Sequence, residues 1–142
     1  MQLFKKKKTK VNHKRKISEI ILHCSASDNP SHDDIKVIRL WHLKRKWKDV
    51  GYHYYIRKDG TLEKGRAESD SGAHVRGRNK YSIGICLGGL EEFTKEQFET
   101  AGKLVKMLLN KYDLKKSDVN PHNKYSNKLC PVYDIKEVLK RA

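Results

Sequence analysis

The sequence predicts one α/β domain in which a central mixed β-sheet is flanked by helices. Short apolar runs typical of buried strands alternate along the chain with segments of helical periodicity, which is the pattern of α/β folds. An Asp59-Gly60 pair between two strand-like runs is a strong hairpin signal, so at least one strand pair is antiparallel. The chain of 142 residues has about the usual length of one domain.

The first half of the domain contains two strand-like runs and one helix. Residues 17–24 form a short apolar run that ends in polar residues, which predicts a buried strand with His23 near its end. Residues 31–34 resemble a capping box, and apolar residues then recur at helical spacing to about Lys46. The aromatic and β-branched run at residues 52–58 predicts the first strand of the hairpin.

The second half predicts one strand and two helices. Residues 81–87 form an apolar run in which Gly84 indicates a close approach of backbone or a bulge. A capping box at residues 94–97 begins an amphipathic helix, whose apolar residues follow at steps of three and four to Tyr112. Residues 134–139 predict a short helix near the C-terminus.

Positive charge is concentrated at the start of the chain. The formal net charge is +15, and residues 1–16 hold seven lysines and one arginine without an acidic residue. This segment also lacks hydrophobic periodicity, which predicts a basic, flexible tail before a domain at residues 17–142. A basic surface attracts nucleic acid, anionic lipid or the acidic polymers of a bacterial envelope, and charge alone does not select among them.

The apolar segments and the cysteines bear on where the chain works. No apolar run approaches the ~18 residues of a membrane helix, so we expect no membrane span. The lysine-rich start is not followed by the apolar core of a signal peptide, so we expect cytoplasmic synthesis without one. An odd number of cysteines, three, indicates a reducing compartment in which thiols stay free or bind metal.

One Pro-bracketed loop, residues 121–131, brings an imidazole, an ammonium group and a thiol together. With His23, the loop residues His122 and Cys130 would give two imidazoles and a thiol, the ligand set of a catalytic zinc ion with one open position. The two loop residues are too far apart for a zinc knuckle, but they can reach one ion if the loop folds back. Spacing alone also leaves packing or surface roles open for all three.

The other histidines and cysteines are expected to be structural. His13, His32 and His42 lie in polar or helical surroundings and are interpreted as surface residues. Cys24 follows a candidate ligand on a strand, where neighbours point to opposite faces, so we expect it in the core. Cys86, in an apolar run, is expected to be a small buried hydrophobe.

Six short segments carry a further signal: HCSAS at 23–27, WKDVGYH at 47–53, RKDG at 57–60, GAH at 72–74, SIGICL at 82–87 and KLCP at 128–131. In this order and spacing they resemble the zinc-dependent N-acetylmuramoyl-L-alanine amidases. That family includes the small lysozyme of phages and the animal peptidoglycan recognition proteins. The similarity extends over residues 17–142.

The resemblance implies a fold, a reaction and a set of site residues. The fold is a central mixed sheet flanked by helices with zinc in a surface groove. The reaction is hydrolysis of the amide bond between N-acetylmuramic acid and L-alanine in peptidoglycan. Because no export signal is found, a phage lysin is preferred to a host-cell autolysin with another export route. The implied residues are the zinc ligands His23, His122 and Cys130, the catalytic residues Tyr52 and Lys128, and a substrate-binding residue, His74.

The chemistry expected of Tyr52 and Lys128 follows from what zinc hydrolysis requires. The chain has no His-Glu-x-x-His sequence, so the glutamate base of thermolysin-like enzymes is missing and Tyr52 would orient or deprotonate the water. Lys128 would neutralise charge on the carbonyl oxygen. Without the resemblance, a solvated surface lysine and a core tyrosine would be the expected roles.

Two other functions remain open at the level of sequence. One is a peptidoglycan-binding module without catalysis, and the other is a nucleic-acid-binding protein, a hypothesis that rests on the net charge of +15 and the basic tail. The basic tail could also bind anionic envelope polymers, and a phage RNA polymerase is a conceivable protein partner. We expect an amidase to reach the wall after release by a separate membrane-permeabilising phage protein.

Overall fold

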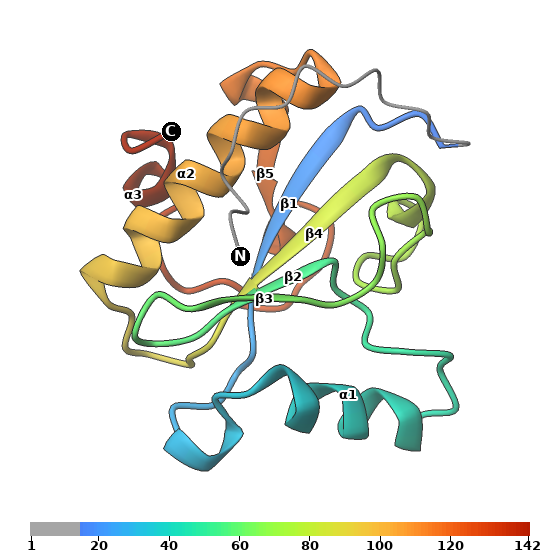
Figure 1. The fold of residues 1–142 in the computed structure, drawn as a ribbon, viewed down its shortest axis with the longest axis vertical. Helices are drawn as coiled ribbons and strands as arrows, with labels where there is room; N and C mark the ends of the chain where they lie inside the picture. The colour runs from blue at the N-terminus through green and yellow to red at the C-terminus, as the bar shows by residue number, and fades with distance from the viewer. Residues whose placement is uncertain (1–14) are drawn as a thin grey trace.

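A mixed five-stranded sheet organises residues 15–142, the part of the chain that the computed structural model describes (Figure 1). The strands are β1 (Glu19–Cys24), β2 (Tyr54–Ile56), β3 (Leu62–Lys64), β4 (Ser82–Leu87) and β5 (Val119–Pro121), in the order β3-β2-β4-β1-β5. All neighbouring strands are parallel except β3, which pairs antiparallel with β2 across the predicted turn. The predicted α/β fold with a mixed sheet is confirmed.

Helices flank both faces of the sheet. They are α1 (Ile35–Lys44), α2 (Lys95–Tyr112) and α3 (Lys136–Leu139). In Figure 1, α2 and α3 lie together on one side of the strands, and α1 lies apart from them at the bottom of the view.

Short 3-10 turns lie at Pro30–His32, Asn79–Tyr81, Lys116–Asp118 and His122–Lys124. The last of these follows β5 directly, so a candidate ligand stands at the end of a strand.

The face toward α2 is apolar. Alternate residues of the central strands, among them Ile20, Leu22 and Ile85, pack against Leu104 and Leu108 of α2. The start of this helix matches the prediction, because the Thr94 side chain caps the backbone of Gln97 and the Gln97 side chain returns to the backbone of Thr94. This face supplies the hydrophobic core of the domain.

The face toward α1 carries polar groups among its apolar ones. Tyr55 and Cys86 pack against Ile35 and Ile38 of α1. Cys86 is the register partner of His23, and side chains of parallel register partners point to the same face. The strands therefore present histidine on the side opposite to the main core.

Several predicted details differ in the structure. Helix α1 is capped by the side chain of Asp34, which accepts a hydrogen bond from the Lys36 N–H group, and not by residue 31. The predicted strand at 52–58 is shortened to β2, and the three-residue β5 was not predicted. The register of β1 and β4 runs through Gly84 without a bulge, and the close neighbour there is the side-chain ring of His74.

One histidine prediction is wrong. His42 is only 8% exposed, and its Nδ1 atom accepts a hydrogen bond of 2.8 Å from the Gly51 N–H group. Burial, followed by the nearby charges of Arg45 and Arg66, lowers its pKa to about 4. The sequence gives no signal that the loop after this helix folds back to hydrogen-bond the histidine. Cys24 and Cys86 are buried, as predicted, and His13 lies outside the described residues.

The predicted tail, residues 1–16, lies almost entirely outside the described residues. Within them, the Arg15 guanidinium donates to the carbonyl groups of Asn79, Ser82 and Glu68. The packed part of the structure thus includes Arg15. No helix among residues 15–142 combines the length and apolar character that crossing a bilayer requires.

Candidate active site

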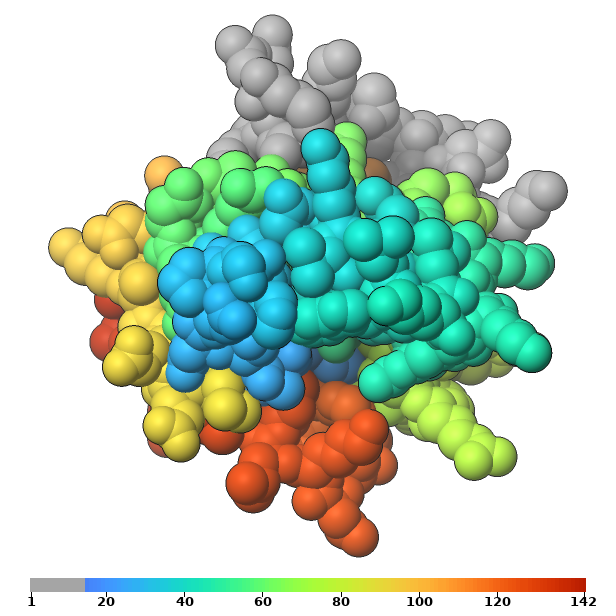
Figure 2. Space-filling view, turned by 90° about the horizontal axis from the view of Figure 1, so that it is seen from below, coloured from blue at the N-terminus to red at the C-terminus, as the bar shows by residue number. Residues whose placement is uncertain are grey.

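His23 comes together with His122 and Cys130, although about a hundred residues separate it from them in the sequence. His23 stands near the end of β1 and is 1% exposed, while His122 follows β5 and Cys130 lies in the loop beyond it. One ligand atom from each lies within 4.8 Å of the other two. In Figure 2 the orange segment that follows β5 projects at the lower edge of the view. The structure therefore gathers the three predicted ligands at one place.

The spacing of the two imidazoles fits a shared cation. Their Nδ1 atoms are 3.2 Å apart. Two nitrogens bound to a tetrahedral zinc ion at the usual bond length are separated by about 3.3 Å. Burial, followed by the neighbouring rings of His74 and His122, lowers the pKa of His23 well below its usual value. Burial also lowers the pKa of His122. Both rings are thus held neutral, which is the form that binds metal.

The third candidate ligand, the Cys130 thiol, lies beside a backbone hydrogen-bond donor. The Cys24 N–H group lies 3.1 Å from Cys130 Sγ, and a hydrogen bond to sulfur favours the thiolate. Hydrogen bonding between the two thiols lowers the pKa of Cys24 to about 7 and raises that of Cys130. The two thiols therefore titrate as a coupled pair, and the Cys24 N–H group is a backbone donor that would support a thiolate on Cys130.

Tyr52 and Lys128 lie at the same cluster. The ring centroids of Tyr52 and His23 are 5.0 Å apart. Burial, followed by the nearby thiols of Cys86 and Cys130, raises the pKa of Tyr52 well above its usual value, so its hydroxyl keeps its proton and is a hydrogen-bond donor. The exposed Lys128 is close enough to lower the pKa of His122 through its charge.

Comparison with known proteins decides the family. Residues 13–133 match the family model described as N-acetylmuramoyl-L-alanine amidase. The chain belongs to this amidase family. The endolysin of Escherichia phage T7 is 38% identical to it over 125 residues, which cover 82% of each protein. The predicted family and amidase activity are therefore confirmed.

Solved structures give the same result for the fold of the amidase. An N-acetylmuramoyl-L-alanine amidase, LysC from Clostridium intestinale, superimposes with a TM-score of 0.81 at 30% identity, covering 94% of this chain and 89% of that one. Drosophila PGRP-LB superimposes with a TM-score of 0.72 at 25% identity, covering 84% of this chain and 76% of that one. A bacterial amidase and an animal peptidoglycan recognition protein thus share this architecture.

His74 lies behind His23 in the amidase. Its Nδ1 atom is 2.8 Å from His23 Nε2, and its Nε2 atom is 3.1 Å from Ser82 Oγ. Both ring nitrogens therefore have partners within the protein. A role for His74 in contacting substrate stays a prediction.

Other residues that support the site were missed by the sequence reasoning. Glu19, 3% exposed, accepts hydrogen bonds from Arg78, Asn120 and Tyr125, and so ties the start of β1 to the segment around His122. The Tyr133 hydroxyl donates to the His23 carbonyl at 2.8 Å. These contacts join distant parts of the chain, so no local sequence pattern predicts them.

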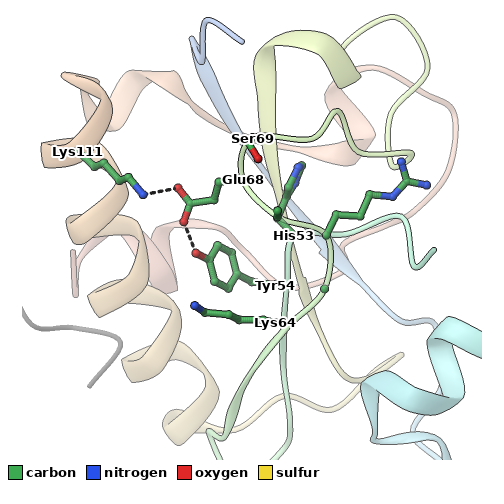
Figure 3. A pocket seen from close by; sticks show the side chains of 9 residues that line it. His53, Tyr54, Lys64, Glu68, Ser69 and Lys111 are labelled. Atoms are coloured by element: carbon green, nitrogen blue, oxygen red, sulfur yellow. Dashed lines mark hydrogen bonds and ion pairs between the residues drawn. The ribbon is translucent and has the colours of Figure 1, made fainter. Parts of the chain in front are cut away.

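A separate hollow of about 420 Å³ lies between α2 and the β2–β3 hairpin (Figure 3). Tyr54, Lys64, Glu68 and Lys111 are among the residues that line it. The Glu68 carboxylate is satisfied by Tyr54 and Lys111, as the dashed lines in Figure 3 mark. The predicted ligands are not among its lining residues, so the chemistry is assigned to the cluster around His23.

Proposed function

We propose that the amidase binds one zinc ion through His23, His122 and Cys130 and with it hydrolyses the bond between N-acetylmuramic acid and L-alanine. The observation that carries this proposal is the convergence of three ligand atoms within 4.8 Å, in a chain of the amidase family. Two imidazoles and one thiolate are a ligand set found in catalytic zinc sites, and three protein ligands leave a fourth position for water.

The chain's own residues would divide the remaining work. A zinc ion in such a site lowers the pKa of bound water to about 7 and polarises a carbonyl group. Tyr52, beside His23, would donate a hydrogen bond that orients the reacting groups. Lys128, beside His122, would place its ammonium group near the carbonyl oxygen, where negative charge develops during attack.

The proposed substrate is bacterial peptidoglycan. The names of the relatives support it, since they include endolysins and peptidoglycan recognition proteins. We propose that the amidase acts on the cell wall after release by a separate membrane-permeabilising protein. Binding of anionic envelope polymers by the tail, and binding of a phage RNA polymerase, stay predictions.

Metal analysis combined with a peptide-release assay tests the proposal. We expect about one zinc per chain and release of stem peptides from purified peptidoglycan. Cys130→Ala should lose both, whereas Cys86→Ala, which removes a buried thiol that is not a proposed ligand, should keep the zinc. Full zinc content in Cys130→Ala would remove Cys130 from the site. Binding of peptidoglycan by a zinc-loaded protein without peptide release would contradict the reaction.

A further inference from the structure

The ring of His74 occupies a space that two glycines leave open. A Cβ atom on Gly84 would lie 2.7 Å from His74 Cγ, and one on Gly72 would lie 2.6 Å from His74 Cδ2. Either contact is closer than real Cβ atoms tolerate. The backbone of His74 is also held, because its N–H group donates to Asn79 Oδ1 at 2.9 Å. The ring is therefore fixed against β4 and directed at His23.

A chain of hydrogen bonds runs through this ring, and its direction is determined. It ends at the Arg78 carbonyl, which can only accept, so the Ser82 hydroxyl donates to it at 2.8 Å. Ser82 Oγ must then accept from His74 Nε2–H. In a neutral imidazole the other nitrogen carries no proton, so His74 Nδ1 accepts from His23 Nε2–H.

At its other end, this series of hydrogen bonds reaches His23, a proposed zinc ligand. With its proton on Nε2, His23 keeps a lone pair on Nδ1, the atom that lies 3.2 Å from His122 Nδ1. The opposite tautomer would direct a proton into the space where the proposed ion binds. The hydrogen bonds from the Arg78 carbonyl through Ser82 and His74 thus select the tautomer of His23 that can bind metal.

We propose that His74, supported by Ser82, is a positioning residue that fixes the tautomer and orientation of His23 for zinc. This inference rests on the proposed zinc site and assigns His74 a role other than contact with substrate. Groups that accept the second ring N–H of a metal-binding histidine are most often carboxylates, carbonyls or water. Here a neutral imidazole accepts it, so the residue behind His23 adds no negative charge.

Zinc affinity of three variants tests the inference, measured by competition with a chromogenic chelator. His74→Leu removes the acceptor at similar volume and should weaken zinc binding by about 10- to 100-fold. His74→Asn can place an amide oxygen where Nδ1 stands, so its affinity should lie closer to wild type than to His74→Leu. Ser82→Ala is a smaller change that should preserve folding, and it should also weaken zinc binding.

The matched control is His53→Asn. His53 is a buried histidine on the same face. Its Nδ1 atom accepts from the Gly84 N–H group, and its Nε2 atom lies near the Asp70 carbonyl and the Arg15 guanidinium instead of a candidate ligand. This variant should lose stability and keep zinc affinity. The absorption bands of the cobalt-substituted protein give a second readout, and His74→Leu should alter them.

The outcomes separate this inference from the proposed function. Unchanged zinc affinity in His74→Leu with a raised KM would overturn positioning in favour of substrate contact. Equal losses in His74→Asn and His74→Leu, or no loss in Ser82→Ala, would overturn the hydrogen-bond chain. A wild-type protein that binds no zinc would instead contradict the proposed zinc site itself.

Discussion

The two faces of the sheet are built by alternate residues of the same strands, yet they differ in content. Toward α2, residues such as Ile20 and Leu22 of β1 and Ile85 of β4 form an apolar core. Toward α1, the intervening positions include His23 and Ser82, which belong to a connected polar network. One face of each strand stabilises the fold, and the other positions the proposed chemistry.

This difference teaches that stability and metal binding should be separable by mutation. A loss of packing on the α2 face should lower the free energy of unfolding without changing the ligands. Changes on the α1 face should alter zinc binding or turnover with smaller effects on the core. Variants on the two faces therefore test that separation.

The largest effect is expected for Leu108→Ala on the α2 face. Leu108 is fully buried in the main core, so the change should lower the free energy of unfolding by about 2–5 kcal/mol. Urea unfolding of the metal-free protein measures it. The folded fraction should still bind one zinc per chain. Loss of zinc from folded Leu108→Ala would show that packing on the α2 face and metal binding are not separable.

Lys128→Ala should affect turnover and leave stability intact. Removal of a group that stabilises charge in the transition state raises the barrier by about 3–4 kcal/mol, a fall in kcat of about 100- to 1,000-fold. Peptide release from peptidoglycan measures it, and Lys124→Ala in the same loop is the control. Activity equal to that of the control would make Lys128 an ordinary surface lysine.

Stability should fall in acid because of His53. Burial, the first cause, lowers its pKa from 6.5 to about 4, so the unfolded chain binds a proton that the folded protein excludes. Neutral His53 therefore contributes about 3 kcal/mol to the free energy of unfolding above pH 6.5, and this contribution is lost as the pH falls toward 4. Urea unfolding against pH should show a correspondingly shallower dependence in His53→Asn. An unchanged dependence would contradict a neutral His53.

The smallest effect is expected for Thr94→Ala at the start of α2. Loss of the cap leaves the Gln97 N–H group without its side-chain acceptor and should cost about 1 kcal/mol of stability. Thr94→Ser keeps the hydroxyl and should remain near wild type in thermal unfolding. Equal losses in both variants would indicate a packing effect instead of capping.

The elements that sequence predicted well have local causes. The capping box at residues 94–97 and the Asp59-Gly60 turn are each set by neighbouring residues, and both are present as predicted. The three-residue β5 has no such signal, because its pairing with β1 depends on residues about a hundred positions away. The burial of His42 was missed because its hydrogen bond to the Gly51 N–H group, nine residues later, depends on how the loop after α1 folds back.

The site was accessible from sequence mainly through family resemblance. Spacing placed His122 and Cys130 in one loop but could not bring His23 to them, since that contact depends on the order of strands in the sheet. The network behind His23 was not predicted at all. Ser82 resembles any strand serine until the fold places it beside His74.

X-ray absorption at the zinc edge of the purified amidase tests the central claim most directly. Ligation by His23, His122 and Cys130 predicts one sulfur neighbour at about 2.3 Å and imidazole nitrogens at about 2.0–2.1 Å. The sulfur signal should disappear from any zinc that remains in Cys130→Ala. A wild-type spectrum without sulfur in the coordination shell would contradict the proposed site.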